Sequence, residues 1–268
     1  MEFYTSVHPI GDKIYIRGYE KGKPYKRKLD FQPTFYVTSN KPSKWKTLEG
    51  IFVDEIKPGS IRDARDFVKR YDEVEGFAVY GNTNYAYQYI SDNYDTVNWD
   101  MEQIKVFTID IETSTENGFP DVRLANEEVL LITIKDLQSK RIITFGSKPF
   151  VHNRDDVVYI TCRDEQHLLK EFMLFWQDNY PDVVTGWNTD FFDMPYLIRR
   201  IDRELGADVS KKISPWGMIN ERKTFIKGNE ELLKSRGVEV IVLQDVETIE
   251  MMERFIHENP TLWNEDIG

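Results

Sequence analysis

The sequence predicts an α/β fold, in which a mixed sheet flanked by helices follows a smaller α+β domain. Three strands in meander order and then alternating strands and helices, between residues 105 and 205, indicate the mixed sheet. The 268 residues suffice for two modest domains with their own cores. Charge divides the chain similarly: residues 1–100 carry 15 basic and 15 acidic side chains, and residues 101–268 carry 20 and 31. We therefore expect domains over 1–100 and 101–268.

Composition excludes several classes of protein. The single cysteine, Cys162, rules out a disulfide framework and a thiolate zinc cluster. An apolar span of membrane length and a secretory leader are both absent from the sequence, so we expect a soluble, cytoplasmic protein. No G-x-G-x-x-G follows a strand and no P-loop signature occurs, which disfavours a nucleotide-dependent oxidoreductase. The net charge of -11 argues against a uniformly basic nucleic-acid-binding surface, and the acidic second domain indicates a solvated shell, a cation site or both.

The first domain begins with a basic hairpin. Strands are predicted over residues 13–19 and 25–29, joined by a turn that contains Gly22. Residues 13–28 carry seven Lys or Arg and one Glu. Two interpretations stay open: a sheet edge protected by lysines, or a contact to a nucleic-acid backbone. The second would use Tyr15, Tyr19 and Tyr25 as stacking faces.

Helical spacing explains the rest of the first domain and much of the second. Ser60 is predicted to cap a helix that runs to about residue 71, and residues 82–95 are predicted to form a short helix and a loop. In the second domain, Asp164 is predicted to cap a helix to about residue 179. The other expected elements are strands over 105–112, 128–135, 141–145, 157–161 and 182–187, a helix over 192–205, a hairpin over 224–243 and a last helix from Asp245.

The strand VFTIDIE carries two carboxylates on one face. Alternation places Thr108, Asp110 and Glu112 on the face opposite to three apolar residues. Neighbouring carboxylates repel one another, and a divalent cation with oxygen ligands relieves that repulsion. Taken alone, the pattern is more typical of an exposed strand face than of a metal site.

A second acidic segment follows about eighty residues later. In VVTGWNTDFFDMPYL a strand ends at Trp187, Asn188 lies in the turn, and Asp193 falls in the first turn of a helix with Pro195. The Asp193 carboxylate is predicted either to cap this helix or to face the carboxylates of the first strand.

Together the two segments resemble the first two exonuclease motifs of family B DNA polymerases, in the form found in T-even-type bacteriophages. The strand with Asp-x-Glu and the later Trp-Asn-x-x-x-Phe-Asp-x-Pro-Tyr carry the resemblance, which is fainter over residues 1–100. It implies that residues 101–268 have a ribonuclease-H-like fold and remove misinserted nucleotides in the 3′→5′ direction. It also implies that residues 1–100 are the N-terminal domain of such a polymerase, and that the phage protein works in the host cytoplasm.

The resemblance assigns roles to three carboxylates. Asp110, Glu112 and Asp193 would hold two Mg²⁺ or Mn²⁺ ions about 4 Å apart across the scissile phosphate. Asp110 would bridge both ions, Glu112 would bind the ion that generates the attacking hydroxide, and Asp193 would act on the second ion directly or through water. The implied partner is the 3′ end of single-stranded DNA or a primer-template.

Further candidate DNA contacts surround this site. Phe119 in the GFP loop would stack on unpaired bases or wedge between them, and Asn188, Phe192 and Tyr196 would line the same groove. Core packing is the alternative for Phe192, and a plain loop anchor the alternative for Phe119. The hairpin over 224–243 matches the family's exonuclease hairpin in placement only.

One family motif is missing from the sequence. The third exonuclease motif is Tyr-x-x-x-Asp, and no tyrosine follows Tyr196. Asp245 is interpreted as an ordinary helix cap, so a fourth carboxylate is lacking. We expect either an expressed N-terminal piece of a longer polymerase or one product of a split gene, with impaired activity alone. The alternative function is a nucleic-acid-binding or assembly subunit for a second polypeptide that carries the polymerase domain.

Overall fold

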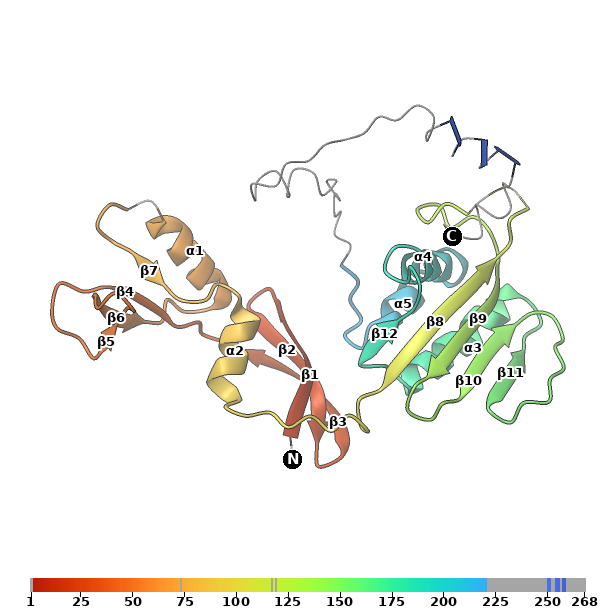
Figure 1. The fold of residues 1–268 in the computed structure, drawn as a ribbon, viewed down its shortest axis with the longest axis horizontal. Helices are drawn as coiled ribbons and strands as arrows, with labels where there is room; N and C mark the ends of the chain where they lie inside the picture. Colours follow the sequence, from red (N-terminus) through yellow and green to blue (C-terminus); the bar gives the residue numbers. More distant parts are fainter. Residues whose placement is uncertain are drawn as a thin grey trace. The chain divides into compact units, whose positions relative to one another are not determined.

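The computed structural model describes residues 2–72, 74–116, 118, 120–220, 250–251, 254–255 and 257–258 (Figure 1). It divides into two compact units, Met1–Ile104 and Lys105–Gly268. Phe119, the hairpin predicted over 224–243 and Asp245 lie outside the described residues. Within the described part of the chain, no helix is long and apolar enough to cross a membrane.

The first unit contains two antiparallel sheets and two helices. One sheet has the strand order β1-β2-β3 and the other β5-β6-β4-β7. A single cluster of buried side chains, among them Ile16, Phe35 and Ile61, connects the first sheet, the second sheet and α1. The elements are β1 (Glu2–Ile10), β2 (Lys13–Glu20), β3 (Lys23–Asp30), β4 (Phe35–Thr38), β5 (Trp45–Lys46), β6 (Phe52–Ile56), α1 (Ile61–Tyr71), β7 (Val79–Tyr80) and α2 (Tyr85–Asn93).

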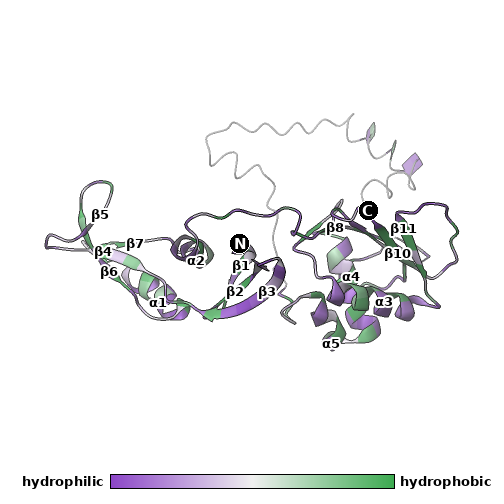
Figure 2. Cartoon of the chain, turned by 90° about the horizontal axis from the view of Figure 1, so that it is seen from below, coloured by the Kyte–Doolittle hydropathy of each residue, from purple (hydrophilic) through white to green (hydrophobic). Residues whose placement is uncertain are grey.

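The basic hairpin is formed by β2 and β3, as predicted, and its side chains favour the structural interpretation. Arg27 donates to Glu2 at 2.7 Å and to Glu20 at 2.6 Å, and Lys13 pairs with Asp30. Tyr15 and Tyr19 are buried, at 8% and 9% exposure, so their rings are not stacking faces. Figure 2 shows β3, at the edge of its sheet, as predominantly hydrophilic. The lysines of β3 therefore protect a sheet edge against pairing with other chains.

Helix α1 begins at the predicted cap. The Ser60 hydroxyl accepts a hydrogen bond from the Asp63 backbone N–H at 3.3 Å, and the Asp63 carboxylate accepts one from the Ser60 N–H at 2.8 Å. This reciprocal arrangement satisfies two backbone donors that would otherwise lack partners.

Substitution of Ser60 by Ala is expected to lower the free energy of unfolding by about 1 kcal/mol, because the Asp63 N–H loses its acceptor. Urea unfolding followed by circular dichroism measures the difference. Ser60→Thr retains a hydroxyl acceptor and serves as the control, so equal losses in both variants would show that the cap does not stabilise the helix.

The second unit is built on a five-stranded mixed sheet. Its strand order is β11-β10-β9-β8-β12, with β8–β9 and β9–β10 antiparallel and the two outer pairs parallel. The predicted meander followed by strand–helix alternation is therefore confirmed. The elements are β8 (Val106–Thr113), β9 (Val129–Asp136), β10 (Ile142–Gly146), β11 (Val157–Thr161), α3 (Glu165–Asp178), β12 (Val183–Thr185), α4 (Asp193–Leu205), α5 (Ala207–Ser210) and the 3₁₀ helix η1 (Lys211–Ile213).

Alternation along the strands decides which face of this sheet is buried. Ile109 and Ile111 of β8, with Ile132 of β9, join a core cluster that also contains side chains of α3 and α4. Figure 1 shows α3 behind the strands, and α3 begins at Asp164, whose carboxylate accepts from the His167 N–H at 2.8 Å. The residues between the core positions, Asp110 among them, point to the opposite face.

Candidate active site

The Asp-x-Glu pair lies on the sheet face that α3 and α4 leave uncovered. Asp110 and Glu112 are exposed, whereas Ile109 and Ile111 on the other face are 1% and 7% exposed. The surrounding protein partly desolvates both carboxyls although they reach solvent, and it raises their pKa values. The charge of Asp110 raises the pKa of Glu112 further. Burial and a neighbouring like charge both disfavour the ionised form of a carboxyl.

Asp193 comes from the start of α4 and contacts the strand between the other two carboxylates. Its Oδ1 accepts a hydrogen bond from the backbone N–H of Ile111 at 3.1 Å. The N-cap residue of α4 is Phe192, which makes no side-chain capping bond. Of the two roles predicted for Asp193, the structure thus supports a carboxylate that faces the strand of Asp110 and Glu112 rather than a cap of α4.

The end of β12 makes room for this contact. β12 pairs with β8 only as far as Thr185, opposite Thr108, and among the residues that the structure describes no strand pairs with this edge of β8 beyond that point. Gly186 then passes so close to β8 that a Cβ atom there would lie 2.5 Å from the Ile109 carbonyl oxygen. The chain turns at Asn188, whose φ is 56°, and enters α4. Asp193 therefore takes a backbone donor that a longer β12 would have occupied.

Burial makes Asp193 the most perturbed of the three acids. Its side chain is buried, at 4% exposure, and the pKa of its carboxyl is raised to about 6. Desolvation is the main cause, the charges of Asp110 and Glu112 add to it, and the Ile111 N–H opposes it. No basic side chain in the described part of the chain contributes to the pKa shift of any of these acids. The site is thus an uncompensated acidic cluster in partly desolvated surroundings.

The chemistry of this cluster suits a hard divalent cation. Mg²⁺ and Mn²⁺ prefer carboxylate oxygens, and a cation would stabilise the charged forms of carboxyls whose pKa values are raised mainly by desolvation. Within the residues that the structure describes, no three His, Cys, Asp or Glu side chains are arranged to hold one metal ion as they stand. The donor types fit a metal, and the carboxylates of Asp110 and Glu112 are exposed to the solvent from which it would come.

The predicted DNA contacts have different surroundings. Tyr196 is completely buried, and its hydroxyl donates to the Glu127 carbonyl at 2.7 Å and accepts from the Glu127 N–H at 3.0 Å. Its predicted place in an open groove is therefore wrong: the ring belongs to the core and fastens the loop before β9 to α4. Phe192 stacks on Tyr196 with ring centroids 5.5 Å apart and packs against the same core. Asn188 lies half-buried in the turn before α4.

Two exposed aromatic residues beside this turn were not predicted as site residues. Trp187 and Phe191 are 82% and 64% exposed, although large aromatic rings are usually buried. Both belong to the segment WNTDFFD that ends in Asp193. The signal was present in the sequence, because three aromatic residues occupy a short loop that can bury only one of them.

Comparison with known proteins places this geometry in a family. A family model described as DNA polymerase family B, exonuclease domain, matches residues 77–251. The chain belongs to the family B DNA polymerases. Its exonuclease domain includes β8 and the start of α4, so all three acids lie inside the matched region.

Individual relatives agree with this assignment. Over 95% of its own length, this chain is 26% identical to the DNA-directed DNA polymerase of Escherichia phage RB69. Over 91% of its length, it is 28% identical to the DNA-directed DNA polymerase of Enterobacteria phage T4. It spans about 30% of the length of each of these relatives. The structure of the family B DNA polymerase from Pyrobaculum calidifontis matches 82% of this chain and 34% of its own, with a TM-score of 0.55 at 18% identity. That match shows a shared fold, in agreement with the predicted ribonuclease-H-like α/β class.

Proposed function

We propose that this chain carries out metal-dependent 3′→5′ hydrolysis of DNA, with residues 101–268 as a proofreading domain and residues 1–100 as the N-terminal domain of a replicative polymerase. The position of Asp193 carries the proposal. Its carboxylate is bonded to the backbone between Asp110 and Glu112, and all three acids have raised pKa values without a compensating base. The substrate is the 3′ end of single-stranded DNA or a frayed primer-template.

The residues of this chain supply positions and charge rather than a covalent nucleophile. Asp110, Glu112 and Asp193 would hold two Mg²⁺ or Mn²⁺ ions, whose charge would promote ionisation of a water and stabilise the departing 3′ oxygen. Asp110, whose charge raises the pKa of both Glu112 and Asp193, would be the ligand that the two ions share. Glu112 would act on the side of the attacking water, and Asp193 would act on the side of the leaving group. Water attacks phosphorus, the bond from phosphorus to the 3′ oxygen breaks, and a 5′-nucleotide leaves a strand with a new 3′-hydroxyl.

The 268-residue chain alone is proposed to be a weak nuclease. The family's Tyr-x-x-x-Asp motif does not occur in its sequence, so the ion on the nucleophile side lacks one carboxylate ligand. A second polypeptide that carries the polymerase domain is the partner we propose for full activity. The rate of 3′ trimming should therefore rise when a polypeptide that carries the missing motif is added.

Cleavage of 5′-labelled single-stranded DNA in Mn²⁺ tests this function. Asp110→Ala is expected to lower the rate of 3′ trimming by roughly 100-fold, because it removes charge stabilisation at the reacting phosphate. Asp178→Ala removes an exposed acid of α3 and serves as the matched control. Trimming that persists in Asp110→Ala would contradict the assignment of the site.

The alternative is a binding or assembly subunit without activity of its own. It predicts salt-dependent DNA binding that survives loss of Asp110 and Glu112. Tyr15 and Tyr19 are buried, and Tyr25 is half-buried against the core of the first unit, so little stacking surface remains for a nucleic-acid contact of the basic hairpin. The geometry therefore favours the nuclease.

A further inference from the structure

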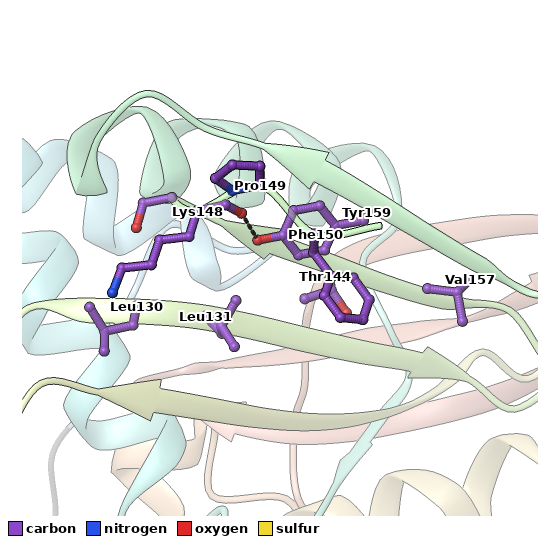
Figure 3. Close-up of a pocket in the computed structure, with 9 residues that line it drawn as sticks. Leu130, Leu131, Thr144, Lys148, Pro149, Phe150, Val157 and Tyr159 are labelled. Carbon is purple, nitrogen blue, oxygen red and sulfur yellow. Dashed lines mark hydrogen bonds between the residues drawn. The ribbon is translucent and has the colours of Figure 1, made fainter. Parts of the chain in front are cut away.

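A cleft of about 400 Å³ opens on the second unit, over β9, β10 and β11 (Figure 3). Its walls are largely apolar and aromatic, with Phe150 and Tyr159 as the two rings and Lys148 as a charged residue of the rim. The ring centroids of Phe150 and Tyr159 are 5.4 Å apart, and the Tyr159 hydroxyl donates to the Lys148 carbonyl, which ties the rim to β11. Phe150 is 59% exposed. The Phe150 ring also stacks on His152, with centroids 5.9 Å apart. The cleft therefore offers an exposed aromatic side chain on a fixed support.

Strand register places this cleft beside the acidic site. Leu131, which lines the cleft, is paired with Glu112 across β8 and β9. Directly paired residues point to the same sheet face, with Cβ atoms about 5 Å apart. Tyr159 of β11 lies on the same face, because it pairs with Thr144 of β10. Since β11 is three strands from β8, Tyr159 lies about 14 Å from β8. The cleft is thus continuous with the face that bears Asp110 and Glu112.

Gly146 leaves room for two side chains that line the cleft. A Cβ atom at this position would lie 2.2 Å from the Tyr159 hydroxyl oxygen and 2.5 Å from a Leu131 methyl carbon. Both side chains therefore occupy the space that a side chain at this position of β10 would take. With Phe150 they form part of an apolar lining, which suits the flat face of a planar ligand.

We propose that this cleft holds an unpaired base of the DNA strand whose 3′ end lies at Asp110, Glu112 and Asp193, an inference that rests on the proposed nuclease function. A nucleobase presents a flat π-face that stacks on Phe150 regardless of sequence. The Lys148 ammonium complements the phosphate that adjoins such a base. The cleft begins at Leu131, one strand from Glu112, and extends to Tyr159, three strands from β8. It therefore accommodates a base a short distance along the strand from the scissile bond, and a mismatched, unpaired end is the substrate that reaches it.

Binding of 5′-fluorescein-labelled oligothymidylate to the 268-residue chain in EDTA tests the cleft without any cleavage. Phe150→Ala is expected to raise the dissociation constant about tenfold, because one stacked base loses its platform. Lys148→Gln should lower the slope of log K against log salt by about one phosphate contact. Val151→Ala is the matched control, since Val151 is 93% exposed and does not line the cleft. Circular dichroism confirms that each variant is folded.

The outcomes separate the cleft from the nuclease. If Phe150→Ala and Val151→Ala bind the oligonucleotide equally well, the cleft proposal is overturned, and Mn²⁺-dependent trimming by the parent chain would still support the nuclease. If Phe150→Ala alone loses affinity while the parent chain does not trim, the cleft is supported and the nuclease proposal fails. A parent chain that does not bind the oligonucleotide overturns the cleft proposal. A 2-aminopurine base whose fluorescence is quenched near the 3′ end in the parent chain but not in Phe150→Ala gives independent support.

Discussion

Asp193→Asn is expected to make the metal-free protein more stable at neutral pH, by about 2 to 3 kcal/mol, while it removes stabilisation by Mn²⁺. The Asp193 carboxyl is buried, and its pKa is raised to about 6 by desolvation and by two neighbouring acids. Asn has nearly the same shape and retains an oxygen that can accept from the Ile111 N–H at the position of Oδ1. The substitution thus removes the cost of a buried charge and keeps the contact that positions the side chain.

The pH dependence follows from the direction of this shift. An unfolded aspartate has a pKa of about 3.9, so between about pH 4 and pH 6 the folded protein binds the Asp193 proton and the unfolded chain does not. In this window the free energy of unfolding falls as pH rises, by up to about 3 kcal/mol. The contribution is fully present below about pH 4 and is lost above about pH 6. Asp193→Asn should abolish most of this decline.

Thermal unfolding in EDTA over pH 4 to 8 measures the effect, and Asp190→Asn, an exposed acid of the same loop, is the control. A ligand that binds only the folded state raises the midpoint temperature in proportion to RT ln(1 + [L]/Kd). Mn²⁺ should therefore stabilise the parent chain and the control but not Asp193→Asn. A less stable Asp193→Asn protein, or one that still gains stability from Mn²⁺, would show that Asp193 is not the strained ligand we infer.

The elements of this fold could be predicted from local patterns. Alternation in VFTIDIE placed Asp110 and Glu112 on one face of the strand. Ser60 and Asp164 are the N-cap residues of α1 and α3, as predicted. These features depend on neighbours a few residues away. The strand predicted over 182–187 is shorter in the structure, since β12 ends at Thr185 where Gly186 approaches the Ile109 carbonyl.

Contacts between distant segments were beyond local reasoning. The sequence left Asp193 with two roles, and only the fold brings it to the Ile111 N–H, 82 residues away along the chain. Tyr196 was assigned to a groove because its motif lies beside a DNA site, but its ring points inward from α4. The cleft at Phe150 depends on β11 lying parallel to β10 and on the absence of a side chain at Gly146, neither of which the pattern of residues 141–161 indicates.

A buried ion pair is another such contact, and its loss is expected to have the largest effect on stability. Arg200 of α4 and Glu165 of α3 are each 7% exposed and form two parallel hydrogen bonds of 2.6 Å. Glu165 also accepts from the Val129 N–H at 2.8 Å, and Arg200 donates to the carbonyls of Ala125 and Asn126 at 3.0 and 3.1 Å. In the sequence, RRIDRE looks like a solvated helix face.

Arg200→Ala is expected to lower the free energy of unfolding by about 3 to 5 kcal/mol, because it leaves the Glu165 carboxylate buried without its partner. Arg203, one turn further along α4, has a side chain that is 54% exposed and makes only long contacts, so Arg203→Ala should change stability by less than about 0.5 kcal/mol. Denaturant unfolding compares the two. Similar losses of unfolding free energy in the two variants would show that truncation of any arginine in α4 destabilises the protein, and that the ion pair itself contributes little.

A conservative variant keeps this prediction testable if Arg200→Ala does not fold. Glu165→Gln retains an oxygen for the Val129 N–H but loses the charge, so its cost should be smaller, about 1 to 3 kcal/mol. Arg200 and Tyr196 together bind the backbone of residues 125–127, which connect the carboxylate strand β8 to β9. Faster hydrogen exchange at the Glu127 and Val129 amides in Glu165→Gln, with β8 still protected, would show that the ion pair fastens this loop to the helix that carries Asp193. Helix α4 would then position the Asp193 carboxylate and also anchor residues 125–127 of the loop that follows Asp110 and Glu112.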